Sequence, residues 1–325
     1  MEVLFIGTGG GRINLLRQMR GTGGFIIKGS RAGAGNGAGA AGGNSAAAAT
    51  GGTGAIIHVD PGPGALINML RLGQDPLKTD AVIVTHCHID HCNDAALMIE
   101  GMSEFALKKK GILIASKGSV QGTGKFDKSI SGYHQSKVSQ LIIPKPGESV
   151  KFRIKESEIA LHAIPVHHDE ETGFGFRLFM DGQVLGYTSD TEYFEGLAEN
   201  FKGCDLLVVN NLKPFADGIP DHLASDDVVK LLKIAKPKIA VLSHLGMKFK
   251  RGQPELEAEK ISHETGVHTI AGHDGMGLDL ASGKVLIYSA TSMFDAPNMV
   301  HGARNASSHG EKAEEKGERK LSEFE

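Results

Sequence analysis

One short stretch limits what this chain can fold into, because four side chains that commonly bind metals fall within six residues. Residues 81–84 form an apolar run, and after Thr85 the chain reads His86-Cys87-His88-Ile89-Asp90-His91. The apolar run predicts a buried strand. At the end of a strand and in the loop beyond it, residues two apart can converge on one point. Imidazoles and a carboxylate there suit zinc or a related transition metal, and they are enough to begin two adjacent metal sites.

Candidate ligands follow three later apolar runs in the same way. His168 follows residues 159–164, Asp190 follows 184–187, and His244 follows 239–242. A lone histidine at the end of a strand is more often structural. Three repeats of one arrangement, added to the His/Asp cluster, instead favour a single shared site.

Composition restricts the class of protein. At 325 residues the chain can form one large domain or two small ones, and the pattern of elements favours one. With 35 Lys+Arg against 38 Asp+Glu, it carries no global charge that would attract nucleic acid or a membrane. Three cysteines fit a reducing compartment. No apolar run approaches the roughly 20 residues of a membrane span, and the first residues lack the basic start of a signal peptide. We therefore expect a soluble, cytoplasmic protein.

Alternating and continuous apolar runs predict an α+β fold. The strands expected are 3–7, 25–27, 55–60, 81–84, 112–114, 141–143, 150–154, 159–164, 174–179, 184–187, 206–209, 239–242, 267–270 and 285–288. Helices are expected near 66–72, 94–102, 225–235 and 254–263, and a long polar loop after 114. The close spacing from 141 to 187 predicts antiparallel strands. Together these elements indicate two facing sheets with helices outside.

Three segments depart from this pattern. In residues 29–54, 19 of 26 residues are Gly or Ala, which predicts a flexible insert. Residues 291–325 have mixed charge and few apolar side chains, which predicts a disordered tail. Between 108 and 137 there are seven lysines and one acid. That excess fits either a solvated surface or a contact surface for a phosphate-bearing substrate.

The ligand pattern resembles the metallo-β-lactamase superfamily over residues 1–290. The resemblance also rests on two further motifs, Asp60-Pro61-Gly62 and Asp274-Gly275-Met276. The resemblance implies a four-layer αββα sandwich with two metals, usually zinc, at one edge. It assigns one metal to His86, His88 and His168, the other to Asp90, His91 and His244, and the bridging position to Asp190. His167 is an alternative to His168, and the Gly-Phe-Gly-Phe that follows favours His168.

The branch within the superfamily bears on function. True β-lactamases use a cysteine at the second metal, whereas this chain offers Asp190 and His91. The glyoxalase and lactonase type of Gly-His-Thr stretch is absent, and the sequence is more similar to ribonuclease Z and phosphodiesterase-like members. The segment from Asp221 to Ser225 resembles their His-Ser/Thr element, so His222 either contacts substrate, acts as an acid or simply begins a helix. There is no clear counterpart of the ribonuclease Z arm that grips transfer RNA.

These observations predict a dinuclear metal-dependent hydrolase of a phosphodiester or related phosphate ester. Two ions about 3.5–4 Å apart can share a hydroxide for in-line attack. Asp90 would bind metal and orient the hydroxide, and Asp190 would set the metal spacing. Zinc is the expected ion, with manganese and iron as alternatives. The expected partner is an anionic small-molecule or nucleic-acid-derived substrate and no membrane; a homodimer is one alternative for the oligomeric state. Competing functions are hydrolysis of a carboxyl ester, lactone or thioester, and a non-hydrolytic role in metal binding or cofactor biosynthesis.

Overall fold

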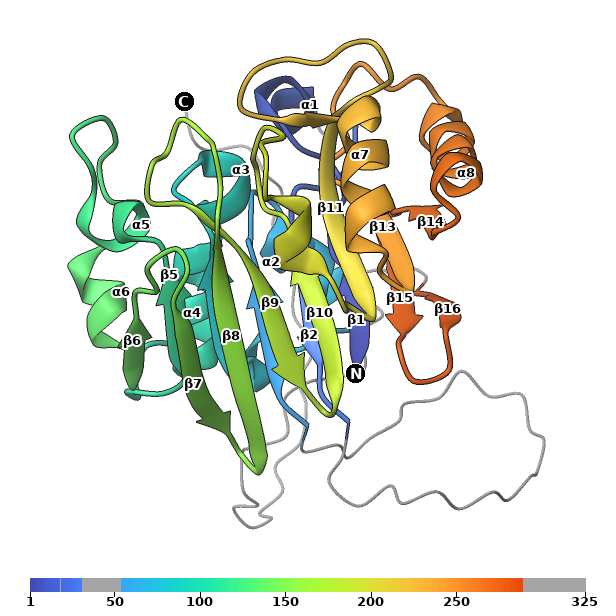
Figure 1. Cartoon of the computed structure of the whole chain (residues 1–325). Helices are drawn as coiled ribbons and strands as arrows, with labels where there is room; N and C mark the ends of the chain where they lie inside the picture. The colour runs from blue at the N-terminus through green and yellow to red at the C-terminus, as the bar shows by residue number, and fades with distance from the viewer. Residues whose placement is uncertain (18, 31–53, 289–325) are drawn as a thin grey trace, which may run out of the picture.

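Two mixed β-sheets packed face to face form the centre of the protein (Figure 1). The structure is a computed structural model that describes residues 1–17, 19–30 and 54–288. Helices cover the outer face of each sheet, which gives four layers in the order helix, sheet, sheet, helix. The predicted αββα architecture is therefore confirmed.

The first sheet comes mainly from the N-terminal half of the chain. Its strands, in spatial order, are β16 (Lys284–Ile287), β15 (Met276–Asp279), β1 (Glu2–Phe5), β2 (Phe25–Lys28), β3 (Ile56–Val59), β4 (Ala81–Val84), β5 (Ile112–Ala115) and β6 (Gln140–Ile142). Strands β3 to β6 run parallel, and the other neighbouring pairs are antiparallel. The helices of this half are α1 (Arg12–Arg17), α2 (Ala65–Arg71), η1 (Pro76–Lys78), α3 (Ile89–Cys92), α4 (Ala95–Met102), α5 (Lys117–Gln121) and α6 (Gly132–Ser136).

The second sheet follows in the chain. Its order is β14 (His268–Ala271), β13 (Ile239–Ser243), β11 (Leu206–Lys213), β10 (Gln183–Tyr187), β9 (Phe174–Met180), β8 (Ser157–Pro165) and β7 (Ser149–Ile154), and the short β12 (Leu223–Ala224) pairs with β11. Strands β7 to β10 are antiparallel, as predicted for that stretch. Strands β10, β11, β13 and β14 run parallel. The helices here are η2 (Ala198–Phe201), α7 (Ser225–Ala235) and α8 (Gln253–Thr265).

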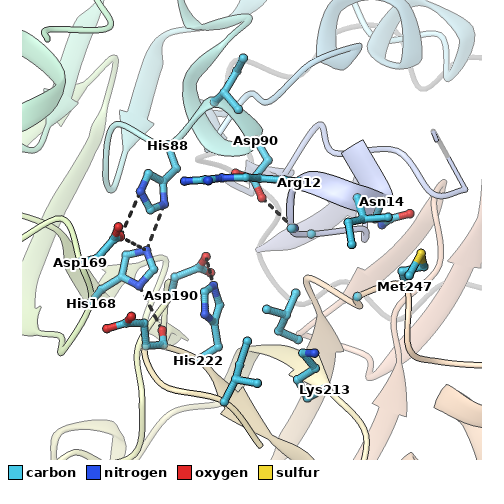
Figure 2. Close-up of a pocket in the computed structure, with 18 of the residues that line it drawn as sticks. Arg12, Asn14, His88, Asp90, His168, Asp169, Asp190, Lys213, His222 and Met247 are labelled. Carbon is cyan, nitrogen blue, oxygen red and sulfur yellow. Dashed lines mark hydrogen bonds and ion pairs between the residues drawn. The ribbon is translucent and has the colours of Figure 1, made fainter. Parts of the chain in front are cut away.

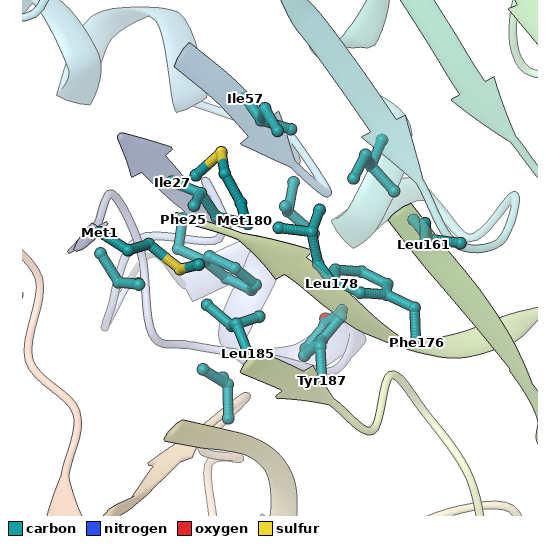
Figure 3. Packing of buried hydrophobic residues seen from close by; sticks show 14 of the residues in the cluster. Met1, Phe25, Ile27, Ile57, Leu161, Phe176, Leu178, Met180, Leu185 and Tyr187 are labelled. Atoms are coloured by element: carbon teal, nitrogen blue, oxygen red, sulfur yellow. The ribbon is translucent and has the colours of Figure 1, made fainter. Parts of the chain in front are cut away.

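Apolar side chains fill all three spaces between the layers. Between the sheets, Phe25 from the first packs edge-on against Tyr187 from the second, with ring centroids 5.1 Å apart (Figure 3). Outside the first sheet, Met98 and Ile99 of α4 pack on its outer face. Outside the second sheet, α7 and α8 do the same. Burial of this kind is the main favourable contribution to folding.

The parallel strands explain where the candidate ligands meet. The carboxyl ends of β3 and β4 reach one edge of the first sheet, and those of β10, β11 and β13 reach the same edge of the second. At the top of Figure 1, α1, α3 and the connection after β11 cover this edge. Segments more than 150 residues apart in the chain are therefore brought together here.

Several local expectations were wrong. Asp90 and His91 lie on the helical turn α3 and not in a loop. The polar segment after β5 contains the short helices α5 and α6, each begun by a serine whose side chain accepts a backbone N–H. Strand β6 pairs in parallel with β5 and does not join the antiparallel run. Most of the predicted insert, residues 31–53, and the predicted tail lie outside the described residues.

No helix in the described part of the chain is both long and apolar enough to cross a bilayer.

His58 on β3 is fully buried, and its Nε2 donates to the carbonyl of Gly23 at 2.8 Å. Burial lowers the pKa of His58 from 6.5 to about 4. The unfolded chain therefore takes up a proton below pH 6.5 while the folded chain does not, so stability is lost as the pH falls from 6.5 toward 4.

Glutamine at position 58 keeps a hydrogen-bond donor but cannot titrate. We predict that, between pH 7 and pH 5, the free energy of unfolding falls by about 2 kcal/mol less in His58→Gln than in the wild-type protein. Urea unfolding of both metal-free proteins at the two pH values measures this difference. Equal losses in the two proteins would show that His58 does not remain neutral in the fold.

Candidate metal centre

The backbone around Asp90 is held close to the segment that follows β3. The N–H of Asp94 donates to the Pro61 carbonyl at 2.9 Å. A Cβ on Gly62 would collide with the carbonyl oxygens of Thr22 and Asp90, so only glycine allows these segments to approach. This close approach accounts for Gly62 in the sequence and holds α3 against the segment that follows β3.

Three histidines form the first ligand group. His86, His88 and His168 each offer a ring nitrogen, and these atoms lie within 4.8 Å of one another. His88 Nδ1 and His168 Nε2 are 3.1 Å apart (Figure 2). His86 Nε2 is buried and has no hydrogen-bond partner among the described residues. His86 and His88 come from the segment after β4, and His168 from the segment after β8.

Asp90, His91 and His244 form the second group, again with ligand atoms within 4.8 Å. His91 Nε2 lies 3.1 Å from His244 Nε2, and His244 Nε2 lies 3.3 Å from Asp90 Oδ2. The Gly11 N–H donates to the same Asp90 oxygen at 2.8 Å, which fixes the carboxylate. The structure thus assembles the second triad from α3 and the end of β13.

Asp190 lies between the two groups. Its Oδ2 is 3.2 Å from His244 Nε2 and 3.3 Å from His91 Nε2 in the second group. The same oxygen is 3.9 Å from His86 Nε2 in the first. One carboxylate oxygen therefore faces ligands of both triads.

The donor set fits divalent metals. At a Zn–N distance of 2.0–2.1 Å, tetrahedral ligands are separated by about 3.3 Å, close to the 3.1 Å between paired ring nitrogens in each group. Burial lowers the pKa of His86 well below its usual range and that of His88 to about 4, so both rings are neutral and have a free lone pair. A buried nitrogen without a partner, as in His86, is costly unless a ligand fills the space it faces.

The charge of the second group depends on whether His91 is protonated. Burial by itself would lower the pKa of His91, but Asp190 and Asp90 outweigh that effect and raise it well above the usual value. The histidines hold the pKa of Asp190 well below its ordinary range against the effect of burial. A bound metal would replace the His91 proton as the partner of these carboxylates.

A buried network of hydrogen bonds orients the ligands, and the sequence indicated only one of its members, Asp60. Asp60 Oδ2 accepts from Tyr187 Oη at 2.9 Å and lies 3.0 Å from His91 Nδ1, which leaves His91 Nε2 facing His244. Asn210 Nδ2 donates to Asp190 Oδ1 at 2.7 Å and to Tyr187 Oη at 3.1 Å. Such partners fix the ring and carboxylate orientation of ligands. Tyr187 and Asn210 lie in apolar strands, where the sequence pattern indicates only burial.

Backbone strain accompanies the site. The φ angles of Asp60, Ser189 and His244 are 47°, 55° and 54°. Residues other than glycine rarely adopt this left-handed backbone conformation. Asp60 belongs to the network and His244 to the second triad, and Ser189 Oγ donates to Thr85 Oγ1 at 2.8 Å. Residues in this conformation cluster at functional sites.

His168 and His167 have different surroundings. His167 stacks on Phe194 with ring centroids 3.9 Å apart, and its side chain is 55% exposed. His168 is inside the first group, and its Nδ1 donates to the Asp221 carbonyl at 3.0 Å. Of the two histidines, the structure brings only His168 to the centre.

Asp169 is a further carboxylate beside the first group, and the sequence pattern did not indicate it. Asp169 Oδ1 lies 3.0 Å from His88 Nε2 and 3.4 Å from His168 Nε2 (Figure 2). Its other oxygen accepts from Lys125 at 2.8 Å. Lys125 is therefore the member of the lysine-rich segment that reaches the centre, and it does so through Asp169.

His222 borders the centre, and His273 does not. His222 Nε2 is 3.3 Å from Asp190 Oδ2, and its ring lines the cleft above the ligands (Figure 2). Hydrogen bonding to Asp190 raises the pKa of His222 against the effect of burial. His222 also groups with His168 and Asp190 as a third set of potential ligands. His273 is exposed and pairs with Glu255 at 3.2 Å.

An open cleft of about 670 Å³ lies over the centre. Its floor includes His88, Asp90, His168 and Asp190, and its walls are largely apolar with a few polar groups. This volume is typical of sites for small organic ligands.

Comparison with known proteins places this geometry in a family. Residues 56–245 match the model of the β-lactamase superfamily domain. An uncharacterized protein of Methanocaldococcus jannaschii, MJ1374, is 32% identical over 286 residues, which cover 87% of this chain and 97% of that protein.

Solved structures share the fold at low identity. The metallo-β-lactamase fold protein YhfI of Bacillus subtilis has a TM-score of 0.61 at 18% identity, covering 85% of this chain and 98% of YhfI. The short form of human tRNase Z has a TM-score of 0.56 at 14% identity, covering 86% and 99%.

The adjacent histidines offer a matched test of the ligand set. We predict that His168→Ala lowers zinc affinity at least about 10-fold and removes one metal per chain, because a triad loses a ligand. His167→Ala should keep the wild-type metal content. Elemental analysis after dialysis, with competition against a chelating dye, measures both quantities. Metal loss in His167→Ala alone would contradict the ligand set.

Proposed function

Because this chain belongs to the β-lactamase superfamily, we propose that it is a hydrolase that binds two divalent ions, zinc by preference, and cleaves a phosphodiester. The observation that carries the proposal is the position of Asp190, one oxygen of which faces both ligand triads. An aspartate there, without a cysteine in either triad, differs from the ligand set of true β-lactamases. The human tRNase Z fold is consistent with phosphodiester chemistry.

Divalent ions held by the two triads would supply Lewis acidity and a water nucleophile of lowered pKa. The chain's own residues would do the rest. Asp60 and Asn210 hold His91 and Asp190 in the orientations that both triads need. Asp90 is fixed by the Gly11 N–H and presents its oxygen to the second triad. These contacts exist before substrate binds, so little reorganisation accompanies the reaction.

His222 is positioned to donate a proton to the leaving group. Its ring lines the cleft, and its Nε2 is directed to Asp190, which would stabilise the protonated form. As the water oxygen forms a bond to phosphorus, the bond to the leaving oxygen breaks, and that oxygen takes the proton from His222. General acids of this kind contribute about 10²- to 10⁴-fold.

We predict that zinc- or manganese-loaded protein hydrolyses bis(p-nitrophenyl) phosphate, and that His86→Ala and Asp190→Ala reduce the rate at least about 100-fold. Release of p-nitrophenolate measures the rate, and His167→Ala is the matched control. Loaded protein that leaves this diester intact but cleaves a thioester, lactone or carboxyl ester would move the function to carbonyl substrates.

The acid role of His222 predicts a dependence on the leaving group. His222→Ala should lower kcat about 100-fold for a diester with an alkoxide leaving group, but less than about 5-fold for p-nitrophenolate, which departs without a proton. His273→Ala, outside the cleft, should change neither rate. Equal losses for both substrates, together with loss of metal, would instead make His222 a ligand.

A further inference from the structure

One charged side chain of the cleft lies at the metal centre and belongs neither to the ligand triads nor to their supporting network. Arg12, the first residue of α1, lines the cleft and is exposed. In Figure 2 its side chain runs past Asp90, and its guanidinium group points toward His88. Asp90 and His88 belong to different triads, so the guanidinium group is directed from the second triad toward the first. Lys213, another cation of the cleft, lies apart on the side of Met247 (Figure 2).

The backbone just before Arg12 is packed on the second triad. A Cβ on Gly10 would lie 2.2 Å from the His244 ring, so this close approach requires glycine. The N–H of Gly11 donates to Asp90 Oδ2 at 2.8 Å. Because neighbouring Cα atoms are about 3.8 Å apart, these two contacts fix the base of the Arg12 side chain beside the second triad.

The first turn of α1 is also held by the loop after β13. The Gly10 N–H donates to the Leu245 carbonyl at 3.3 Å. Asn14 Nδ2 donates to the same oxygen at 3.2 Å, and Asn14 is buried. Arg12 therefore extends from a fixed support, which keeps the position of its charge defined before a substrate binds.

The protein supplies no anionic partner for Arg12. Its guanidinium group has neither a hydrogen bond nor an ion pair with any residue in the described ranges. Asp90, which it passes, already accepts a backbone N–H and faces a ligand histidine. Arg20, by contrast, donates to Thr8 Oγ1 and to the Gly272 carbonyl, both at 3.2 Å. Arg20 thus supports the fold, whereas the donors of Arg12 remain available in the cleft.

An anion at the metal centre would be the partner that Arg12 lacks. Divalent ions in the two triads would carry more positive charge than Asp90 and Asp190 neutralise. A further cation at the same place is then favourable only when an anion binds as well. A guanidinium group presents its N–H donors in a planar fork that matches the oxygens of a phosphoryl group.

We propose that Arg12 is a catalytic residue that binds a non-bridging oxygen of the scissile phosphate. As the water oxygen forms its bond to phosphorus, the guanidinium group stabilises the negative charge of the phosphoryl oxygens through N–H donation. It gives up no proton, and the leaving oxygen takes its proton from His222. This inference rests on the proposed phosphodiesterase function and identifies the side chain that recognises the phosphoryl group.

Removal and chemical replacement of the guanidinium group test this role. We expect Arg12→Ala to lower kcat/KM for bis(p-nitrophenyl) phosphate about 10- to 100-fold with unchanged metal content. Guanidinium chloride at a non-denaturing concentration should restore much of the rate, whereas sodium chloride at the same ionic strength should not. Arg17→Ala, which alters an exposed arginine of the same helix outside the cleft, should keep the wild-type rate. A wild-type rate in Arg12→Ala, a loss of metal, or a lower rate that guanidinium does not relieve would overturn the inference.

Calorimetry with inorganic phosphate separates failure of this inference from failure of the proposed function. Phosphate should bind zinc-loaded Arg12→Ala about 10-fold more weakly than the wild-type protein, and Arg17→Ala should bind it as the wild type does. That difference in a protein that leaves every phosphodiester intact would retain the contact between Arg12 and phosphate and overturn the phosphodiesterase. Hydrolysis of the diester, with neither its rate nor the phosphate affinity dependent on Arg12, would overturn the inference and retain the phosphodiesterase.

Discussion

The buried carboxylate of Asp190 is the group on which the rest of the site depends. It is 3% exposed and surrounded by histidines from both triads, and a charge in such a place is stable only with partners on every side. Asn210 occupies one oxygen and leaves the other for the ligands. The same arrangement that stabilises the buried carboxylate also leaves one of its oxygens facing both triads, which is where our proposal places a ligand shared by two ions.

The sandwich supplies those contacts because its parallel strands end at one edge. Each sheet is rigid through burial of its inner face, so residues just beyond the strands are held at fixed separations. Tyr187 links the layers directly: its ring packs in the core between the sheets, and its hydroxyl group donates to Asp60 at the metal centre. The cleft above this edge has candidate ligands on its floor, and its walls include residues of α1 and of the segments after β11 and β13.

The strands could be predicted from the sequence, and the candidate ligand residues that the structure brings together could be recognised in it, for one reason: both depend on local patterns. An apolar run followed by His86 or Asp190 is visible in a few residues. The sequence could not predict α3, because four residues carry no helical period, or the parallel pairing of β6, because pairing depends on distant segments. The sequence also gave no indication that Asn210 or Asp169 would lie at the centre. These two residues meet the candidate ligands only in space, through Asp190 and His88. Of the lysine-rich segment, Lys125 reaches the centre, and it does so through Asp169.

The most direct test of the shared-carboxylate account is the anomalous scattering of zinc-soaked crystals, measured on both sides of the zinc absorption edge. The account predicts two zinc peaks per chain about 3.5–4 Å apart, one among His86, His88 and His168, the other among Asp90, His91 and His244, with Asp190 Oδ2 between them. A single peak, or two peaks of which neither contacts Asp190, would contradict it.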